Sequence, residues 1–426
     1  MPRSYMATHN MIAVSAYARE TAINTERAPD LTLLCALDNV INWDPRRETN
    51  ENEATGKEEP DIVYDLGATA SLSMNFEKAQ PQHFAFLAAY GLGAISSAAA
   101  GTGFQHTITP IAGDLDNNRS NPSFTAAQRY GDTVLKRRFA SMFVDSITAT
   151  FARDSWCKLS ASIKGTGKKT DGVFRETLTA LGNATSLTLA ANGVQGATAA
   201  VRLQNIQQIR IQLTAGVYTE VAYSAVSAAT PAVITITSPG GAATNFTYEI
   251  IYIPTESGWM SFPSRVNETP LRVAQMSLNV GGAWSGTEFQ GGRALQSEMK
   301  NLEWTLNNNM AIEFVPGAGG AFASMALRGG RQQKIKLDRE FREFIMQQRM
   351  ESNDAMGLYI LCEGALYDAT NKYQAEFIFP RVSVLTAPIS VDGKRLGESG
   401  DLQVMEHDTY GSVIVRVKNL QTTYAA

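Results

Sequence analysis

The chain has 426 residues, 44% of them hydrophobic and 18% charged, a length that predicts two or three domains and excludes a single small core. Its formal net charge is −4. That balance excludes a protein that grips nucleic acid through phosphates, because such binding needs a basic face and the densest basic run, at residues 136–138, is interpreted as a solvated strand end.

The first part of the chain begins without a clear period and then becomes strand-like. Residues 1–30 are expected to form an N-terminal arm or a subunit contact. Residues 31–42 are apolar and typical of a strand, and a charge-dense loop is predicted from Asp44 to Asp61. Residues 62–76 alternate between apolar and polar side chains, which is the period of a half-buried strand.

A helix is predicted next, at residues 80–92, because apolar residues repeat there on one helical face: Phe84, Leu87, Ala88 and Gly91. Pro81 suits the first helical turn, and Gly93 suits a helix stop. Short β segments follow as far as residue 163, separated by turns that include residues 116–118.

The middle of the chain changes character after a flexible linker of Gly, Thr and Lys at residues 165–169. Residues 177–257 contain few charges, and their strand-like runs are separated by glycine and proline. This pattern predicts a separate small β-sandwich or an extended β insert.

The last third returns to the earlier pattern. Residues 271–280 predict a strand, residues 281–293 a glycine-rich loop and residues 299–314 a long alternating strand. A second helix is then predicted, with Asp338 near the positive end of its dipole. The expected buried face of this helix consists of Leu337, Phe341, Phe344, Ile345 and Gln348. Further strand-like runs extend to residue 420.

The order of strand, long loop, long strand, helix and several strands therefore occurs twice. The sequence predicts a mainly β fold with short flanking helices, in which two similar domains fill equivalent places in a ring. The expected division is an N-terminal arm at 1–30, a first domain at 31–169, a β-rich insert at 170–261 and a second domain at 262–426.

No set of residues with catalytic or metal-binding chemistry stands out. The four histidines do not form a ligand pair. No Gly-x-Ser-x-Gly elbow is present, and the segment at residues 165–170 lacks the spacing of a phosphate-binding loop. We therefore expect a protein that is not an enzyme, with no catalytic, cofactor-binding or metal site.

The cysteines and the apolar stretches indicate a compartment. Cys35, Cys157 and Cys362 are far apart in the sequence and give no disulfide or zinc spacing. Buried free thiols are expected, in keeping with folding in a reducing cytoplasm. No sustained apolar stretch of about 20 residues predicts a membrane helix, and we expect no sorting signal.

Two ordered sets of segments carry a resemblance to a known family. The first set is LSMNF at residues 72–76, FAFLAAYGLG at 84–93, QHTITP at 105–110 and NPSFT at 121–125. The second set is LEWTLNNN at 302–309, EFIFPRV at 376–382 and VIVRV at 413–417. In this order they resemble the tail tube proteins of siphophages, the bacteriophages with long non-contractile tails. Residues 177–257 depart from the short form of that family and look like an insertion.

The resemblance implies a fold and an assembly. Two fused tube domains, each a β-sandwich or barrel flanked by a helix, would carry a small β-rich, immunoglobulin-like insert on the tube exterior. Homotrimers would form pseudo-hexameric rings, and the rings would stack into a hollow tube. Genomic DNA would pass through the lumen without specific binding, and no lumen residues are assigned.

The resemblance also implies partners and a location. The other partners would be the tape measure, terminator and baseplate proteins of the tail, with no membrane involved. The protein would belong to the tail of the virion after assembly in the host cytoplasm.

Ring stacking needs loops long enough to reach the next ring. Both candidate loops fall between the first two strands of a repeat, and an ordinary solvated loop explains each of them equally well. The candidate residues are Asp44, Arg46, Arg47, Glu48, Glu51, Glu53, Lys57, Glu58 and Glu59 in the first loop, with Trp284, Glu288, Phe289 and Arg293 in the second.

Two other functions remain open from the sequence. Another ring-forming tail component, or a secretion-system tube, would share the expected fold. Alternatively, the β-rich insert would be an adhesin-like tail module that binds host glycans.

Overall fold

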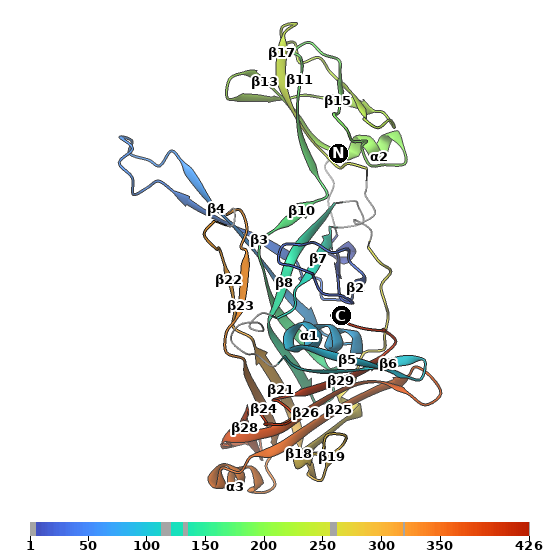
Figure 1. Ribbon diagram of the computed structural model, residues 1–426, viewed down its shortest axis with the longest axis vertical. Coiled ribbons are helices and arrows are strands. Elements are labelled where there is room, and N and C mark those ends of the chain that lie inside the picture. Colours follow the sequence, from blue (N-terminus) through green and yellow to red (C-terminus); the bar gives the residue numbers. More distant parts are fainter. Residues whose placement is uncertain (1–5, 112–120, 131–134, 256–261, 318–319, 426) are drawn as a thin grey trace. The chain divides into compact units, whose positions relative to one another are not determined.

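A computed structural model describes residues 6–111, 121–130, 135–255, 262–317 and 320–425 of the protein (Figure 1). Strands account for 53% of the chain and helices for 8%. The sheets are antiparallel, and among the described strands none closes into a barrel. The mainly β class with short helices is thereby confirmed. The turn expected at residues 116–118 lies outside the described residues.

Contacts within the chain divide it into two compact units. Unit 1 consists of Met1–Met11, Ala127–Arg138 and Lys169–Phe262. Unit 2 consists of Ile12–Ala126, Phe139–Lys168 and Pro263–Ala426. The segment expected as a β-rich insert therefore lies in unit 1. Most residues of the two expected tube domains lie in unit 2, where they pack around one hydrophobic core.

Twenty described strands form the large sheet: β1 (Met11–Val14), β2 (Leu31–Leu33), β3 (Ile41–Thr49), β4 (Val63–Phe76), β5 (Gly93–Ala100), β6 (Gly103–Pro110), β7 (Phe124–Arg129), β8 (Lys136–Ala152), β9 (Lys158–Gly165), β10 (Lys169–Asp171), β18 (Met276–Trp284), β19 (Phe289–Gln290), β20 (Arg293–Ala294), β21 (Met299–Asn307), β24 (Gln332–Glu340), β25 (Met356–Leu366), β26 (Lys372–Thr386), β27 (Ile389–Asp392), β28 (Arg395–Val404) and β29 (Ile414–Asn419). Unit 2 also contains the hairpin of β22 (Met310–Glu313) and β23 (Met325–Arg328), and the helices α1 (Pro81–Leu92) and α3 (Ile345–Ser352).

Unit 2 is built on one continuous ladder of paired strands. β4 pairs with β9, β9 with β8, and β8 with β21. The register of β8 and β21 sets Phe151 opposite Leu302 and Ile147 opposite Leu306, and all four side chains are buried. β21 continues through β24 and β28 to β26. The strands of the two expected tube domains thus share one sheet.

Helix α1 lies at the buried centre of unit 2. All of its residues are buried, because side chains such as Phe86 and Tyr90 spread apolar surface around the whole helix rather than along one face. Pro81 begins the helix, and Gly93 ends it with a left-handed φ of 98°. The helix expected at residues 80–92 is confirmed. It packs against β5, β6 and β29 (Figure 1).

The second expected helix is wrong in its first half. Leu337 lies in β24, and Asp338 beside it accepts a hydrogen bond from the Ser399 hydroxyl (2.6 Å) rather than facing a helix dipole. β24 is paired on both sides, with β21 and with β28, and it buries alternate residues. The two-residue period of this paired strand therefore outweighs the helical spacing.

Two further elements are shorter than the sequence predicts. α3 begins only at Ile345, so Phe341 and Phe344 precede it. The strand expected over residues 299–314 is interrupted after β21. There the buried Asn308 amide turns inward and donates to backbone carbonyls of α1 (2.9 Å) and β8 (3.0 Å).

Unit 1 has two sheets of its own and a separate core. One sheet pairs β11 (Phe174–Leu181), β17 (Asn245–Tyr252), β13 (Ile206–Thr214) and β14 (Val217–Glu220), in that order. The other pairs β12 (Ser186–Thr188), β16 (Val233–Ile236) and β15 (Tyr223–Val226). Ile209 and Tyr248 from the first sheet pack with Leu187 and Ile234 from the second. The short helix α2 (Ala199–Gln204) lies in the same unit.

The basic run at residues 136–138 is not a solvated strand end, so that interpretation is wrong. Lys136 and Arg138 are buried, and Arg137 pairs with Asp171 (2.7 Å). The Lys136 ammonium lies 5.7 Å from the centre of the Phe262 ring. Long basic side chains bury their aliphatic stems against such neighbours, which a count of charges does not reveal.

Two of the cysteines touch in the core of unit 2. The Sγ atoms of Cys157 and Cys362 are 3.7 Å apart, and both residues are fully buried free thiols. The hydrogen bond between the two thiols and burial raise the pKa of the Cys362 thiol. Because 205 residues separate the two cysteines in the chain, this contact could not be predicted from the sequence. The backbone amide of Cys157 donates a hydrogen bond to the Leu271 carbonyl (2.9 Å), shortly before β18, and β18 pairs with the strand that carries Cys362.

Two buried ionisable groups lie at the start of α1. Burial lowers the pKa of His83 to about 3, and its Nδ1 accepts a hydrogen bond from the Gln80 amide (3.2 Å). Burial raises the pKa of Glu268 to about 8, against the opposing effect of the backbone amides of Gln82 and Leu420. The Gln82 amide donates to Glu268 Oε2 (2.7 Å). Both groups are therefore mainly neutral at pH 7.

Glu268→Gln is expected to stabilise unit 2 more and more as the pH rises. The wild-type carboxyl contributes stability that is fully present below pH 4.5 and is lost as the pH rises towards 8. The amide does not ionise, so the variant gains almost nothing at pH 4.5 and on the order of 3 kcal/mol at pH 7. Urea unfolding followed by tryptophan fluorescence measures the difference.

His83 provides the internal control because its contribution has the opposite sign. Its lowered pKa removes stability as the pH falls from 6.5 towards 3. In the wild-type protein the two slopes oppose each other between pH 4.5 and 6.5. In Glu268→Gln the stability should climb there by about 1.4 kcal/mol per pH unit. Parallel profiles for the two proteins would contradict the raised pKa of Glu268.

Candidate assembly surfaces

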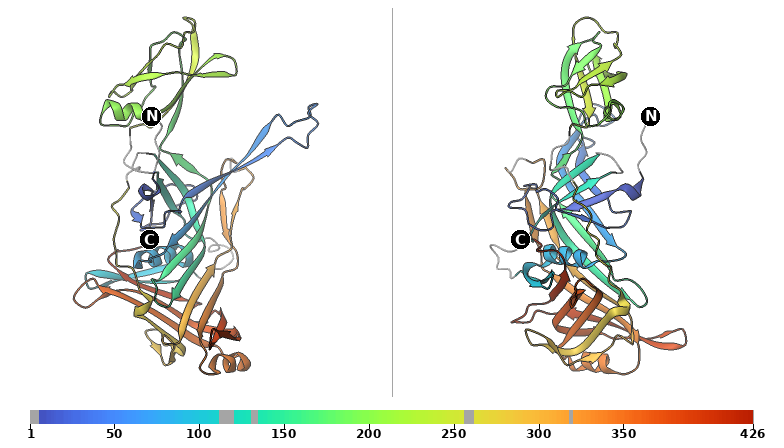
Figure 2. Two further views of the ribbon diagram at one scale, coloured as in Figure 1. Left: turned by 180° about the vertical axis from the view of Figure 1, so that it is seen from behind. Right: turned by 90° about the vertical axis from the view of Figure 1, so that its right-hand side faces the viewer.

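We call the hairpin of β3 and β4 the arm; it is a different segment from the N-terminal arm expected at residues 1–30. The hairpin extends away from the rest of unit 2 (Figures 1 and 2). Its register runs from Ile41 opposite Leu72 to Thr49 opposite Val63. The loop expected over residues 44–61 is therefore wrong in its first part, since only residues 50–62 connect the strands. Charged side chains fit β3 because the strand is exposed from its fourth residue onward. The candidates on β3 are Asp44, Arg46, Arg47 and Glu48.

Polar side chains hold the tip of the arm in place. The buried Asn50 accepts a hydrogen bond from the Asp61 amide (3.0 Å) and donates to the Asp61 carboxylate (2.8 Å). Lys57 is ion-paired with Asp61, and the Tyr64 hydroxyl donates to Glu53 (2.7 Å). Against this one lysine, residues 51–61 carry five carboxylates: Glu51, Glu53, Glu58, Glu59 and Asp61.

Apolar side chains on the arm are uncovered. Val63 is 61% exposed, and Ile62, Tyr64 and Leu66 are exposed with it. A two-stranded hairpin on its own is at best marginally stable in water, and exposed apolar edge strands favour association with another chain. The arm is therefore suited to contact a protein partner.

The second expected stacking segment folds back onto its own sheet. Trp284 is buried at the end of β18, with the Arg416 guanidinium 4.7 Å from the centre of its ring. Phe289 stacks on Tyr359, with ring centres 5.2 Å apart. Glu288 is exposed in the turn between them. The two candidate loops thus differ, because the aromatic residues of the second are occupied within the chain.

Arg293, the remaining candidate, is 43% exposed and lies at the edge of a buried ion network. Its guanidinium pairs with Glu298 (3.1 Å) and with Glu343. Arg339, which is only 2% exposed, pairs with Glu298 (3.0 Å) and Glu398 (2.6 Å). This network joins β20, β24 and β28, so Arg293 is tied to the core of unit 2.

A second exposed apolar surface lies at the end of unit 2 opposite the arm, where Figure 1 shows α3 and β28. α3 packs on β26, and two hydrogen bonds join the neighbouring segments. The Phe341 amide, four residues before α3, donates to the Leu396 carbonyl of β28 (3.0 Å), and the Gln347 side chain of α3 donates to the Ala387 carbonyl, two residues before β27 (3.3 Å). We call it the α3–β27 surface, and its exposed side chains are Phe344, Ile345, Leu385, Ile389, Val391 and Leu396.

Sequence reasoning missed the α3–β27 surface. Val391 is 75% exposed, and among the described strands β27 pairs only with β28. The apolar residues Ile389 and Val391 alternate, and this was the one signal that the sequence offered. Alternation predicts a strand but does not say whether another chain covers it.

Cations surround the α3–β27 surface. Lys394 and Arg395 are exposed in the β27–β28 turn, and Arg342 is exposed just before α3. The Glu340 carboxylate is shared by Arg153 (3.2 Å), Arg395 (3.4 Å) and Arg342 (3.7 Å). The hydrogen bond from Arg153 is the main cause that lowers the pKa of Glu340. The Glu340 carboxylate is thus outnumbered by the three guanidinium groups around it.

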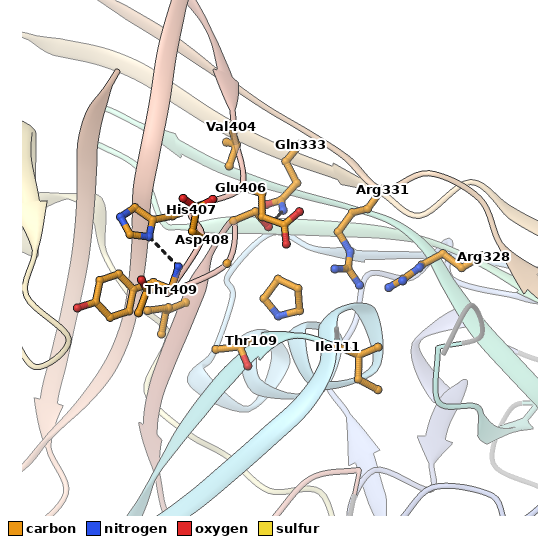
Figure 3. A pocket seen from close by; sticks show the side chains of 15 residues that line it. Thr109, Ile111, Arg328, Arg331, Gln333, Val404, Glu406, His407, Asp408 and Thr409 are labelled. Atoms are coloured by element: carbon orange, nitrogen blue, oxygen red, sulfur yellow. Dashed lines mark hydrogen bonds between the residues drawn. The ribbon is translucent and has the colours of Figure 1, made fainter. Parts of the chain in front are cut away.

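A polar pocket of about 710 Å³ lies elsewhere in unit 2 (Figure 3). The end of β6, the start of β24 and the turn between β28 and β29 form its walls. Arg328, Arg331 and Glu406 point into it opposite Thr109 and Ile111. Burial, and then the charge of Arg328, lower the pKa of Arg331 to about 10. Two adjacent guanidinium groups suit an anion or a carboxylate side chain.

The histidine at this pocket supports the local turn. His407 Nδ1 accepts a hydrogen bond from the Thr409 amide (3.1 Å), and its ring stacks on Tyr410 at 5.0 Å. His407 thus orders the β28–β29 turn rather than activating a neighbouring hydroxyl. Across the described ranges, no three or more His, Cys, Asp or Glu side chains are grouped in a way that could hold a metal ion.

Comparisons with known proteins add no family. The chain matches no protein-family model, and no curated protein matches it significantly. None of the described helices is long and apolar enough to cross a membrane. The resemblance to tail tube proteins therefore rests on the ordered sequence segments alone.

Proposed function

We propose that this chain is the major structural subunit of a siphophage tail tube, whose rings stack into a hollow channel for DNA. The arm carries the proposal, since it is a long exposed hairpin with uncovered apolar side chains and an acidic tip. A protein that leaves such a hairpin uncovered in a single copy is suited to self-assembly.

The single sheet of unit 2 supports the same proposal. The pairing of β8 with β21 joins segments that the sequence assigns to two tube domains, 31–169 and 262–426. Each chain would then supply two similar β-rich tube domains. Three chains would close a pseudo-hexameric ring. The tape measure, terminator and baseplate proteins would be its neighbours in the tail.

The charge balance of the chain supports passage of DNA rather than binding. A formal net charge of −4 leaves no excess of cations to neutralise phosphates along a channel. A neutral or acidic wall repels the phosphates weakly and lets a duplex slide.

For unit 1 we propose a decoration on the tube exterior. Its two sheets share one core, as in a β-sandwich. Within these two sheets the first strand, β11, pairs with the last, β17, whereas the first two strands of an immunoglobulin domain lie side by side. We therefore keep a sandwich architecture for unit 1 and not the immunoglobulin strand order. A map of the assembled tube without radial projections would contradict the exterior position.

A second candidate function concerns unit 1 alone. Its separate core and its exposed aromatic side chains, Phe174 and Tyr218, favour an adhesin-like module that binds host glycans. Binding of the purified protein to a glycan array, with loss of binding in Tyr218→Ala, would support this candidate. Another ring-forming tail component or a secretion-system tube shares the expected assembly and differs in its partners.

Negative-stain electron microscopy of the purified protein at high concentration tests the proposal. The expected result is stacked rings or tubes with an open channel and threefold ring projections. The same protein is also imaged with the tail-tip complex, which supplies an initiator for assembly. Dispersed protein in both preparations would overturn the tube function.

A further inference from the structure

We propose that the arm of one copy docks onto the α3–β27 surface of a second copy. This docking rests on the proposed assembly function and names the two surfaces through which copies join. The acidic tip of the arm would lie over the basic rim, and the apolar side chains of the arm would lie over those of α3 and β27.

The apolar parts of the two surfaces match in character. The arm presents Ile62, Tyr64 and Leu66 along one face, from its connecting loop into β4, and Val63 on the other face. The α3–β27 surface presents aliphatic side chains from β27 together with Phe344 from the start of α3. Each surface is an exposed apolar row on a strand with an open edge, and contact would remove both rows from water.

The charges of the two surfaces are complementary. The arm tip has five carboxylates and one lysine over residues 51–61. The rim of the α3–β27 surface has Lys394, Arg395 and Arg342 exposed, with Glu340 shared among three guanidinium groups. Opposite charges steer two copies together and fix their register, and like-charged tips keep two arms apart.

The placement of the two surfaces requires a second copy. They lie at opposite ends of unit 2, so the arm of a chain does not reach its own α3–β27 surface (Figures 1 and 2). A contact between two different patches is heterologous, and each copy keeps one free arm and one free surface after docking. Such contacts repeat into rings or filaments.

Thiol cross-linking tests the docking directly. Val63→Cys and Val391→Cys are made in a Cys35→Ser background, because Cys157 and Cys362 are buried. The two purified full-length variants are mixed at high concentration and treated with a short bismaleimide. A covalent dimer is expected in the mixture and in neither variant alone. Val217→Cys, in unit 1 and 57% exposed, replaces Val391→Cys in the control mixture and should give none.

Charge reversal supplies an independent test. Glu58→Lys with Glu59→Lys on the arm, or Lys394→Glu with Arg395→Glu on the rim, should each raise the concentration needed for cross-linking about tenfold or more. Mixing an arm reversal carrying Val63→Cys with a rim reversal carrying Val391→Cys should restore the dimer. Both reversals change exposed residues, so thermal melting should be unchanged.

The outcomes separate the docking from the tube function. Absence of the cross-linked dimer overturns the docking whether or not tubes form. Equal dimer yield with Val217→Cys also overturns it, because the reaction would then be random collision. A specific dimer from protein that never forms rings or tubes keeps the docking and removes the tube function.

Discussion

Arg339→Met is expected to destabilise unit 2 by about 3–5 kcal/mol. Arg339 is 2% exposed and pairs with two carboxylates that are also buried, those of Glu298 and Glu398. Methionine fills a similar volume but leaves the buried Glu398 without Arg339, and leaves Glu298 with only the more exposed Arg293 and Arg342. Burial raises the pKa of Glu398 against the opposing effect of Arg339, so loss of Arg339 removes the main interaction that favours its charged form.

The midpoint of urea unfolding, followed by tryptophan fluorescence, measures this effect because four of the five tryptophans belong to unit 2. Arg395→Met is the matched control. Arg395 pairs with Glu340, but its side chain is 75% exposed, so its loss should cost less than about 1 kcal/mol. Similar midpoints for Arg339→Met and Arg395→Met would contradict the buried network as a source of stability.

Deletion of residues 48–59 is expected to abolish tube assembly and leave the monomer folded. The deletion removes the acidic tip and the last rungs of the arm, where Glu48 and Thr49 pair with Tyr64 and Val63. Asn50 is buried, but its hydrogen bonds are made with Asp61 within the tip. The other deleted residues are exposed or half-exposed, so the core of unit 2 loses no contact. The critical concentration for assembly should rise about 100-fold or more, as expected for loss of the central part of an interface.

Pelleting at high speed and negative-stain microscopy measure assembly, and circular dichroism with thermal melting measures folding. Val217→Asp changes an exposed apolar residue of unit 1 and should leave assembly intact. Normal tubes from the deletion variant would show that the arm is only a solvated hairpin. If the deletion variant unfolds at a clearly lower temperature, loss of assembly could reflect misfolding, and the cross-linking experiment then tests the arm.

Local sequence patterns predicted the elements whose environment matches their period. α1 was predicted correctly because Pro81 and Gly93 bracket a run of apolar helix formers, and the whole run is buried in the core. β4 and β9 were also recognisable, since alternate residues are buried along the paired part of each strand. In these cases the pattern is set by water on one side and protein on the other.

The same patterns failed where a neighbour decided the outcome. Leu337 fits a helical spacing, yet β21 and β28 pair with β24 on both sides and impose a strand. Residues 44–49 carry charges typical of a loop, yet β4 supplies hydrogen-bond partners and makes them a strand. Lys136 was expected in solvent and is buried. Hydrogen bonds between strands depend on residues far along the chain, which a local window does not contain.

The candidate assembly surfaces were predicted only in part. The part that was missed again depends on contacts with residues far along the chain. Composition placed a charged segment between the first strands, and that segment is the tip and outer half of the arm. It gave no sign that Val63 and Val391 are uncovered, because an apolar residue on a strand is buried or exposed according to what packs on it.

By itself, the sequence determined that this protein is mainly β with short helices, that its middle segment differs from its flanks, and where its apolar faces repeat. Only the tertiary structure decided that β8 pairs with β21, so that both flanks share one core, and that Cys157 touches Cys362. The tertiary structure also sets which strand faces are exposed. Periodicity follows from the geometry of one chain segment, whereas strand partners, buried charges and open edges follow from contacts between segments hundreds of residues apart.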